Sequence, residues 1–248
     1  MRYLILSDMH GNWEALAAVL RMVEHEHFDV TLVLGDLVGY GAGPNEVVEA
    51  VKNELSGEVF VIRGNHDKVV AELEDGANFN QPALAAARWT TARLVPANLR
   101  YVRGLPEGPL QVAEDLFICH GSPIDEDSYI FSIYDAYEIF TQFEAPLVFF
   151  GHTHIPSLFV RHDEGIEVGV VQGESFHLEL DPKRRYLLNP GSIGQPRDRD
   201  PRAAYLTFDS ETRVVSWYRI DYAIDKAQER IVRSGLPAVL AERLALGV

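Results

Sequence analysis

Residue types that can bind metal ions follow five short apolar runs of this sequence. The runs read LILSDMHG at 4–11, LVLGD at 32–36, VFVIRGNHD at 59–67, LFICHG at 116–121 and LVFFGHTH at 147–154. Strand ends in an open α/β sheet face a common crevice, so we expect these residues to converge there. The sequence therefore predicts a dinuclear metal site, and its candidate residues are Asp8, His10, Asp36, Asn65, His66, Asp67, His120, His152 and His154.

The individual motifs are weaker signals than their combination. D-x-H at 8–10 and G-H-T-H at 151–154 each place two ligands two residues apart, and in an extended strand end both would point to one side. Taken alone, Asp36 is equally well an ordinary turn residue, and His120 is equally well a partly buried histidine. Five strand ends are not expected to carry such side chains by accident.

The motif G-N-H-D at 64–67 carries more information. Gly64 lets the backbone turn after a strand, and Asn65 offers a neutral oxygen ligand. The pair His66 and Asp67 is typical of a general acid whose imidazole is oriented by a carboxylate. A sixth apolar run, YLLNPGS at 186–192, ends in residues able to contact a phosphate.

The elements that position these residues alternate between strand and helix in the first third of the chain. Periodicity and capping signals predict strands at 2–7, 30–35 and 58–63, with helices at 12–27 and 44–54 between them. From 147 onward, short apolar runs predict an antiparallel meander. Its expected strands are 157–161, 166–172, 176–180, 185–189, 203–208 and 213–220.

Three further segments differ from these strands and helices in composition and in expected structure. Residues 68–115 contain a loop at 74–81, a helix at 82–95 that ends before Pro96, and a turn-rich passage, without an obvious ligand. Residues 122–145 are acidic and aromatic, and we expect a loop and a helix there that shape access to the site. The tail 223–246 has an amphipathic helical pattern. We therefore expect one domain over 1–248, with the helical segment 68–115 and the C-terminal helix 223–246 as additions.

Composition limits the function further. The net charge of −15 argues against a stable nucleic-acid complex and against an anionic membrane surface, although two cations would make the pocket locally positive. No apolar run approaches a membrane span and the N-terminus lacks a signal-peptide pattern, so a cytoplasmic location is the expectation. The single Cys119 excludes an intramolecular disulfide. The oligomeric state stays open.

The ordered set of motifs resembles the calcineurin-like metallophosphoesterases. The segments GDLVGYGAGPNE and NPGSIGQPRD are similar to the small bacterial and archaeal phosphodiesterase branch, so the resemblance covers most of 1–208. It implies a four-layer α/β sandwich of two mixed β-sheets flanked by helices, with the dimetal site at one rim. It also implies residue roles: one metal at Asp8, His10 and His154, a second at Asn65, His120 and His152, a bridge at Asp36, and a leaving-group acid at His66 supported by Asp67.

The chemistry implied by this resemblance is the hydrolysis of phosphodiesters, or of phosphomonoesters, by a metal-bridging hydroxide. Four imidazoles, two carboxylates and one carboxamide suit two divalent ions, with Mn preferred and Fe, Zn, Ni or Co as alternatives. The expected substrate is a small phosphoester or a nucleotide. Its identity is not encoded in these motifs.

The sequence departs from the phosphoprotein phosphatases that share the metal motifs. That branch reads G-D-x-V-D-R-G, whereas this chain has Gly39 and Tyr40 in place of the aspartate and the arginine. Arg197 or Arg199 is the candidate substitute for the lost phosphate clamp, and Tyr40 is expected to flank the pocket. A phosphoprotein phosphatase and a non-catalytic interaction scaffold of the same fold are the alternatives. A scaffold would not need His66.

Overall fold

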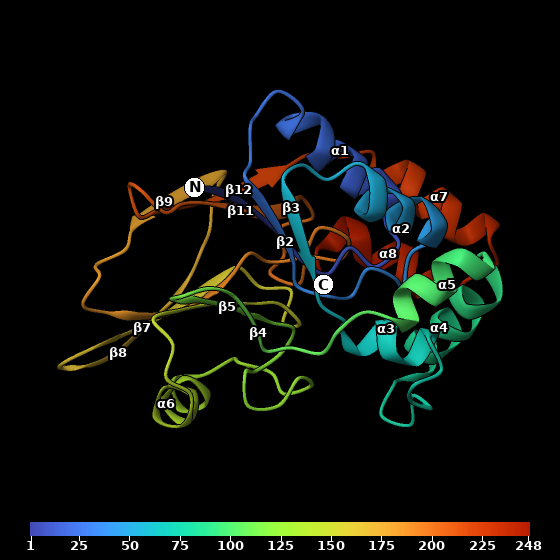
Figure 1. The fold of residues 1–248 in the computed structure, drawn as a ribbon. Coiled ribbons are helices and arrows are strands. Elements are labelled where there is room, and N and C mark those ends of the chain that lie inside the picture. Colours follow the sequence, from blue (N-terminus) through green and yellow to red (C-terminus); the bar gives the residue numbers. More distant parts are fainter.

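Two six-stranded β-sheets lie face to face in the computed structural model, which describes residues 1–248 (Figure 1). The first sheet has the order β3 (Glu58–Val61), β2 (Val30–Val33), β1 (Arg2–Leu6), β11 (Ala203–Asp209), β12 (Val214–Ile220), β9 (Ser175–Glu179). The second has the order β4 (Leu110–Ala113), β5 (Leu116–Cys119), β6 (Leu147–Phe150), β10 (Arg185–Asn189), β7 (Ser157–His162), β8 (Gly165–Val170).

Both sheets are mixed, as predicted. Strands β1, β2 and β3 are parallel neighbours, and the helices α1 (Trp13–Val23) and α2 (Pro44–Asn53) connect them. Asn12 caps α1 by accepting a hydrogen bond from the backbone N of Ala15, and Pro44 opens α2, so the predicted start signals of both helices are confirmed. In the second sheet, β6 lies parallel to both β5 and β10.

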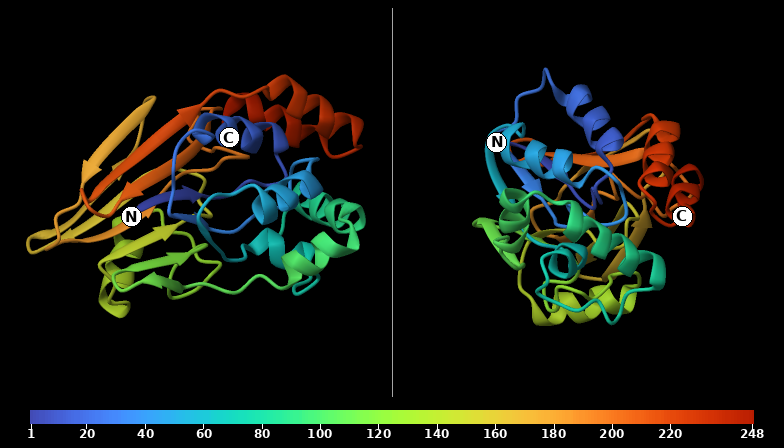
Figure 2. Two further views of the ribbon diagram at one scale, coloured as in Figure 1. Left: turned by 45° about the horizontal axis from the view of Figure 1, so that its top comes forward. Right: turned by 90° about the vertical axis from the view of Figure 1, so that its right-hand side faces the viewer.

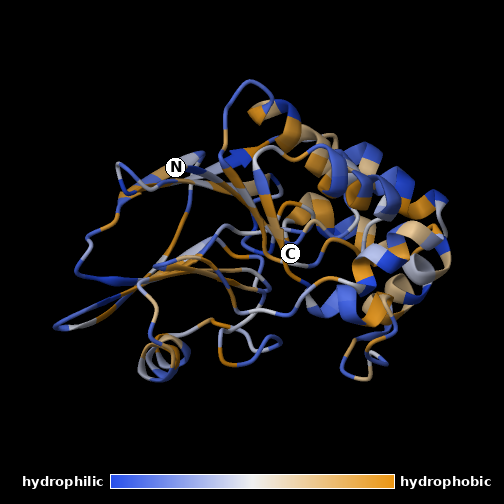
Figure 3. Ribbon diagram, in the orientation of Figure 1, coloured by the Kyte–Doolittle hydropathy of each residue, from blue (hydrophilic) through white to orange (hydrophobic).

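The two-residue period of β1 assigns its side chains to different layers. Leu4 and Leu6 belong to the cluster that packs against α1 and α2, whereas Tyr3 and Ile5 belong to the cluster between the two sheets. Helix α6 (Ile133–Gln142) covers the outer face of the second sheet. The result is the predicted four-layer sandwich (Figure 2). The strands in the middle of the two sheets are coloured mainly as hydrophobic, whereas the helices alternate between hydrophobic and hydrophilic residues (Figure 3).

The remaining helices gather beyond one end of the sheets. They are α3 (Asn65–Val70), α4 (Gln81–Arg93), α5 (Pro96–Arg103), α7 (Ile224–Arg233) and α8 (Ala238–Leu246). The predicted helix at 82–95 is confirmed as α4, but the passage after Pro96 forms α5 because proline is favoured at the first position of a helix. No helix in the structure combines the length and the apolar character that crossing a lipid bilayer requires.

Two other predictions about the second half were wrong. The tail is two helices, because Gly235 adopts a left-handed backbone and Pro237 follows it. The late strands do not form a meander: β9 joins β12 in the first sheet, and β10 returns to the second sheet between β6 and β7. Apolar alternation predicts a strand but does not reveal which of two sheets it joins.

Candidate metal centre

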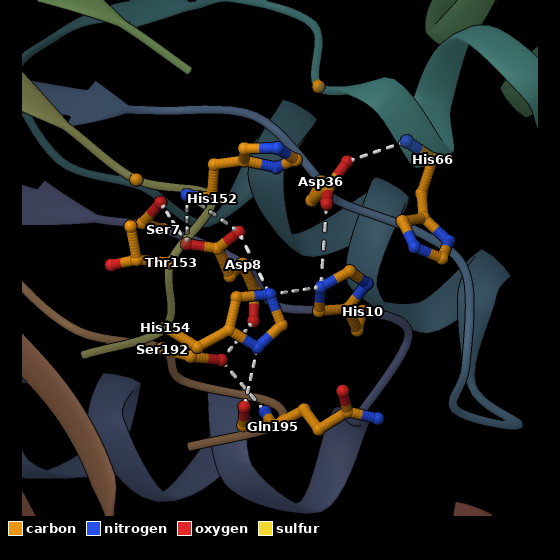
Figure 4. Close-up of polar contacts among 12 residues, drawn as sticks. Ser7, Asp8, His10, Asp36, His66, His152, Thr153, His154, Ser192 and Gln195 are labelled. Carbon is orange, nitrogen blue, oxygen red and sulfur yellow. Dashed lines mark hydrogen bonds and ion pairs between the residues drawn. The ribbon is translucent and has the colours of Figure 1, made fainter. Parts of the chain in front are cut away.

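The predicted ligands converge at one rim of the sandwich, where strands of both sheets end (Figure 4). Asp8 and His10 follow β1, and Asp36 follows β2. Asn65 and His66 open α3 directly after β3. From the second sheet, His120 follows β5, while His152 and His154 follow β6. The rim therefore draws its side chains from five strand ends, as expected from the sequence.

Two groups of side chains have potential ligand atoms within 4.8 Å of one another. One group contains Asp8, His10, Asp36 and His154, and the other contains Asp36, His120 and His152. The Asp36 Oδ2 atom lies 3.4 Å from the Nε2 atoms of both His10 and His120. Asp36 thus belongs to both groups, in the position that a bridging carboxylate would take.

Four imidazoles of the rim share one pattern of hydrogen bonds. In each ring one nitrogen lies beside a backbone carbonyl: His10 Nδ1 at 3.3 Å from Val38 O, His120 Nδ1 at 2.8 Å from Leu34 O, His154 Nδ1 at 2.6 Å from Gln195 O, and His152 Nε2 at 3.0 Å from Asp127 O. Because a carbonyl only accepts, that nitrogen carries the hydrogen, and in the neutral ring the other nitrogen keeps a lone pair for a metal ion. Metal-ligating histidines are oriented in this way.

The contact between two of these rings supports a cation between them. The Nε2 atoms of His10 and His154 are 3.0 Å apart, and the hydrogen bonds at Nδ1 leave a lone pair on each. Two lone pairs at this distance repel each other unless a proton or a metal ion lies between them. The residues therefore fit a metal ion by tautomer as well as by type.

The backbone of the rim is unusual. Five candidate ligands have left-handed φ values: Asp8 at 52°, His10 at 49°, Asp36 at 52°, His152 at 65° and His154 at 60°. Residues other than glycine occupy this region rarely, and such strain is concentrated at functional sites. The expectation of extended strand ends was therefore wrong: the ligands two residues apart converge through left-handed turns.

Burial and neighbouring charges shift the pKa values of Asp8, Asp36 and His120. Burial raises the pKa of Asp8 to about 7. Burial would also raise the pKa of Asp36, but His120, His66 and His10 outweigh it and hold that pKa well below its usual range. Burial lowers the pKa of His120, yet Asp36 and Asp8 raise it to about 10. His120 and Asp36 thus shift each other's pKa in the directions that favour their charged forms.

Asn65 and His66 approach this cluster from the start of α3. The Asn65 Oδ1 atom lies 3.2 Å from His120 Nε2, so its carboxamide oxygen reaches the second group of ligands. The backbone N of His66 donates to Asp36 Oδ1 at 2.8 Å, which fixes the orientation of that carboxylate. A β-carbon on Gly64 would come within 2.2 Å of the same oxygen, so only glycine fits before this helix.

The ring of His66 differs from the four imidazoles held by carbonyls. It lies between Tyr40 and Phe79, with both ring centroids 4.4 Å away, and its Nδ1 has no hydrogen-bond partner. Burial lowers its pKa to about 4. This ring borders the cluster without being locked into a ligand orientation.

Asp67 does not support His66 in the way the sequence suggested. Its carboxylate accepts hydrogen bonds from the backbone N atoms of Gly64, Leu37 and Val38, at 3.0 to 3.3 Å. Burial raises its pKa to about 7. The pairing of Asp67 with His66 was therefore a wrong expectation, because the amides of two loops occupy both carboxylate oxygens. Asp67 joins the loop after β2 to the start of α3.

A pocket of about 240 Å³ opens over the rim. Arg197 and Tyr40 line it, as predicted, and Arg199 does not. One Arg197 amino group lies 3.3 Å from the Tyr40 hydroxyl and 3.0 Å from Gln195 Oε1, while its Nε has no partner. Arg197 is thus the arginine placed to meet an anion.

Two segments away from the metal motifs complete the pocket. Asp127 and Tyr129 line it from the acidic, aromatic segment, as expected. Segment 68–115, for which the sequence suggested no role at the site, contributes lining residues of its own: Glu74, Asn78, Phe79, Asn80 and Ala83. A polar loop carries no periodic signal that would predict its position over a distant site.

Comparisons with known proteins agree with this geometry. A family model described as calcineurin-like phosphoesterase matches residues 1–156. The chain is similar to an uncharacterized protein of Methanocaldococcus jannaschii, with 37% identity over 98% of this chain and 97% of that protein. It is also similar to the crystal structure of a metallophosphoesterase from Sphaerobacter thermophilus, with 37% identity, a TM-score of 0.85, and coverage of 100% and 99% of the two chains.

A shorter match involves an enzyme named for its substrate. The symmetrical bis(5'-nucleosyl)-tetraphosphatase of Klebsiella pneumoniae is 38% identical over 79 residues, which are 32% of this chain and 28% of that protein.

Proposed function

Because this chain belongs to the calcineurin-like phosphoesterase family, we propose that it is a metal-dependent hydrolase of phosphodiester bonds in small molecules or nucleotides. The observation that carries the proposal is the tautomer pattern of the rim. Four histidines donate to backbone carbonyls and present their free nitrogens around Asp8 and Asp36. A non-catalytic scaffold would have no use for such a set.

Seven residues would hold two divalent ions. Asp8, His10 and His154 would bind one ion, Asn65, His120 and His152 the other, and Asp36 both. The mixture of imidazole, carboxylate and carboxamide favours Mn, with Fe, Zn, Ni and Co as alternatives. Two such ions supply an activated water nucleophile at neutral pH and neutralise charge on the phosphoryl group.

Arg197 and His66 would act on the ester itself. The Arg197 guanidinium faces the pocket with its Nε unpaired, so it would bind a phosphoryl oxygen. His66 is not fixed as a ligand and would donate a proton to the leaving group. Its pKa is lowered by burial and by Arg197, but an anionic ester beside the ring would favour the protonated form.

The charges around the pocket favour a diester over a monoester. Glu74 and Asp127 line the pocket, and both pair with Lys68. A monoester carries up to two negative charges at neutral pH, whereas a diester carries one. Lys68 supplies one positive charge against these two carboxylates, so this side of the pocket stays net negative and would disfavour the second charge of a monoester. The named substrate of the Klebsiella pneumoniae relative supports including nucleotides among the candidates.

Two observations disfavour a phosphoprotein phosphatase. A β-carbon on Gly39, whose φ is 127°, would lie 2.7 Å from His66 Nδ1, so an aspartate does not fit there beside the ring of His66. Tyr40 occupies the position of that branch's arginine, and Arg197 approaches the pocket from a different segment.

The proposal is tested by comparing bis(p-nitrophenyl) phosphate with p-nitrophenyl phosphate in the presence of Mn. We expect a higher kcat/KM for the diester, and a loss for Arg197→Ala that Arg197→Lys partly restores. A preference for the monoester would contradict the diester assignment. No turnover of either ester by protein that binds two ions would favour the scaffold alternative.

A further inference from the structure

The segment 189–195, of sequence NPGSIGQ, lies beside the candidate metal centre (Figure 4). It begins at Asn189, the last residue of β10, and both Asn189 and Ser192 are 0% exposed. Neither residue lines the pocket over the rim, so neither is placed to contact a phosphate there. Their polar groups act inside the protein, on the backbone of the neighbouring loops.

Ser192 holds the backbone of Asp8. Its hydroxyl donates to the carbonyl oxygen of Asp8 at 2.8 Å and accepts from the backbone N of Gln195, also at 2.8 Å. The backbone N of Gly194 donates to the same carbonyl of Asp8 at 2.9 Å. Two donors from the segment 189–195 thus fix the peptide group that follows Asp8.

The same segment orients a second candidate ligand. The carbonyl oxygen of Gln195 lies 2.6 Å from Nδ1 of His154. Since the Ser192 hydroxyl holds the backbone N of Gln195, it also fixes the residue that orients His154. Asp8 and His154 belong to one group of potential ligands, with Asp8 Oδ1 at 3.4 Å from His154 Nε2. One buried hydroxyl is therefore linked to two ligands of the same ion.

Asn189 holds the loop 151–154 through its carboxamide. Its Nδ2 donates to the carbonyl oxygen of Gly151 at 2.8 Å and to Thr153 Oγ1 at 3.0 Å. Its Oδ1 accepts from the backbone N of Gly191 at 2.7 Å. The side chain of Asn189 thus connects the loop 151–154 to the segment 189–195.

The backbone that these contacts hold is strained. Asp8, His152 and His154 have left-handed φ values of 52°, 65° and 60°. Such a conformation at residues other than glycine persists only where the surrounding structure enforces it. Water cannot replace the hydrogen bonds of Asn189 and Ser192, because both side chains are fully buried. Loss of either side chain should let a ligand-bearing loop relax.

We propose that Asn189 and Ser192 are positioning residues that hold two ligand-bearing loops in the conformation that binds metal. Ser192 acts on the ion held by Asp8 and His154. Asn189 acts on the loop 151–154, which supplies a ligand to each ion. This inference rests on the proposed two-metal function, but its test does not require hydrolysis.

Ser192→Ala removes a single oxygen atom and tests the proposal directly. Calorimetric titration of the metal-free protein with Mn measures the affinities of the two ions. We expect one affinity to fall by roughly 10–100-fold, the usual effect of losing a group that orients a ligand, and the other by less than about threefold. The matched control is Ser216→Ala in β12, where the buried hydroxyl lies 2.7 Å from His177 Nδ1. It should leave both affinities unchanged.

Two single-ion backgrounds identify the weakened position. In a His120→Asn background the remaining ion is the one at Asp8 and His154, so adding Ser192→Ala should weaken it by roughly 10–100-fold. In a His154→Asn background the remaining ion lies at the other position, and adding Ser192→Ala should have little effect. Equal losses in the two backgrounds would overturn the proposal.

Asn189→Asp is a second test with a side chain of the same size. It replaces the donor to the Gly151 carbonyl by an oxygen, so both ions should bind roughly tenfold more weakly. Unchanged affinities in Ser192→Ala or in Asn189→Asp would contradict a positioning role.

Urea denaturation of the metal-free variants separates positioning from a general loss of stability. An affinity loss that tracks the loss of stability in Ser216→Ala as well as in Ser192→Ala would show a structural role only and would overturn the proposal. Wild-type protein that binds two ions and hydrolyses no ester would refute only the hydrolase function.

Discussion

The carboxylate of Asp36 accepts a hydrogen bond from the backbone N of His66 and lies 3.4 Å from the imidazoles of both His10 and His120. Asp36→Asn should therefore reduce the occupancy of both metal positions, because it removes one negative charge from the shared ligand. His120→Asn, the matched control, should affect mainly one position. We expect a loss of activity of more than about 100-fold for Asp36→Asn, checked together with elemental analysis. Two bound ions with near-normal turnover would show that Asp36 is not the bridge.

His66 allows chemistry to be separated from metal binding. His66→Ala should keep the metal content and lower turnover by roughly 10²–10⁴, the usual contribution of a general acid. Alkyl and nucleoside leaving groups should suffer more than p-nitrophenolate, which departs without a proton. Equal losses for both kinds of leaving group would instead place His66 in phosphate binding.

Asp67 should behave as a structural neighbour of that acid. Its carboxylate holds three backbone N–H groups, and the amide of Asp67→Asn would direct its own amino group toward some of them. We expect a lower free energy of unfolding, by about 2 kcal/mol, and no dependence of the activity loss on the leaving group. The measurements are urea denaturation and a leaving-group series. A dependence like that of His66→Ala would restore the role first expected for Asp67.

The candidate ligands at the rim could be predicted from the sequence because each follows an apolar run. What the sequence did not reveal were contacts made through the backbone. The carbonyl of Asp127 that orients His152 is one example, and the amides that occupy the Asp67 carboxylate are another. Such contacts do not depend on side-chain type, so no motif records them. Phe79 beside His66 is likewise placed by the fold of a polar loop.

At the scale of elements, the positions of the strands in the sequence were easier to predict than the neighbouring strands with which they pair. The parallel β1, β2 and β3 follow from alternating strand and helix signals, whereas the place of β9 in the first sheet depends on contacts distant in sequence. The left-handed turns after β1 and β6 could not be predicted either, because Asp and His do not indicate a left-handed backbone as clearly as glycine does.

An ionic cluster connects α3 to the segment before α6. Glu126 Oε1 accepts hydrogen bonds from Lys68 Nζ at 3.1 Å and from Arg63 at 2.8 Å, and Lys68 Nζ also reaches Asp127 Oδ2 at 2.6 Å. Burial would raise the pKa of Glu126, but the hydrogen bonds from Arg63 and Lys68 outweigh it and lower that pKa. The cluster thus ties the helix that carries Asn65 to the segment whose carbonyl orients His152.

A lowered folded-state pKa makes the contribution of Glu126 dependent on pH. Its stabilisation is fully present above the ordinary glutamate pKa of 4.5 and is lost as the pH falls through the lower folded-state value. Glu126→Gln should therefore destabilise the protein by about 2 kcal/mol at pH 7, and by progressively less below about pH 4.5. Urea denaturation from pH 7 to pH 3 measures this difference. A constant difference across that range would contradict the ion-pair account.

For the whole molecule, the metal centre lies where both sheets end, so its ligands belong to otherwise separate layers. We propose that residues 1–248 act as one domain for this reason, with α3 to α5 and α7 to α8 as additions beside the pocket. Ions that bind the folded rim and not the unfolded chain should stabilise all layers together.

This coupling predicts a thermal shift. Mn at about 100 times its Kd should add about 2.7 kcal/mol of stability for each ion bound, so about 5 kcal/mol for two ions, and should raise the Tm by roughly 10–20 °C for a chain of this length. Differential scanning calorimetry with and without Mn measures the shift, and Asp36→Asn should reduce it. An equal shift in that variant would place the stabilising ions elsewhere.

The central claim is that two divalent ions at this rim are required for phosphodiester hydrolysis. The most direct measurement is the hydrolysis of bis(p-nitrophenyl) phosphate by exhaustively chelated protein as Mn is added in known amounts. The account predicts no activity after chelation, and activity that rises and saturates as two Mn ions bind per chain. Activity that survives chelation, or that is complete with one ion per chain, would contradict it.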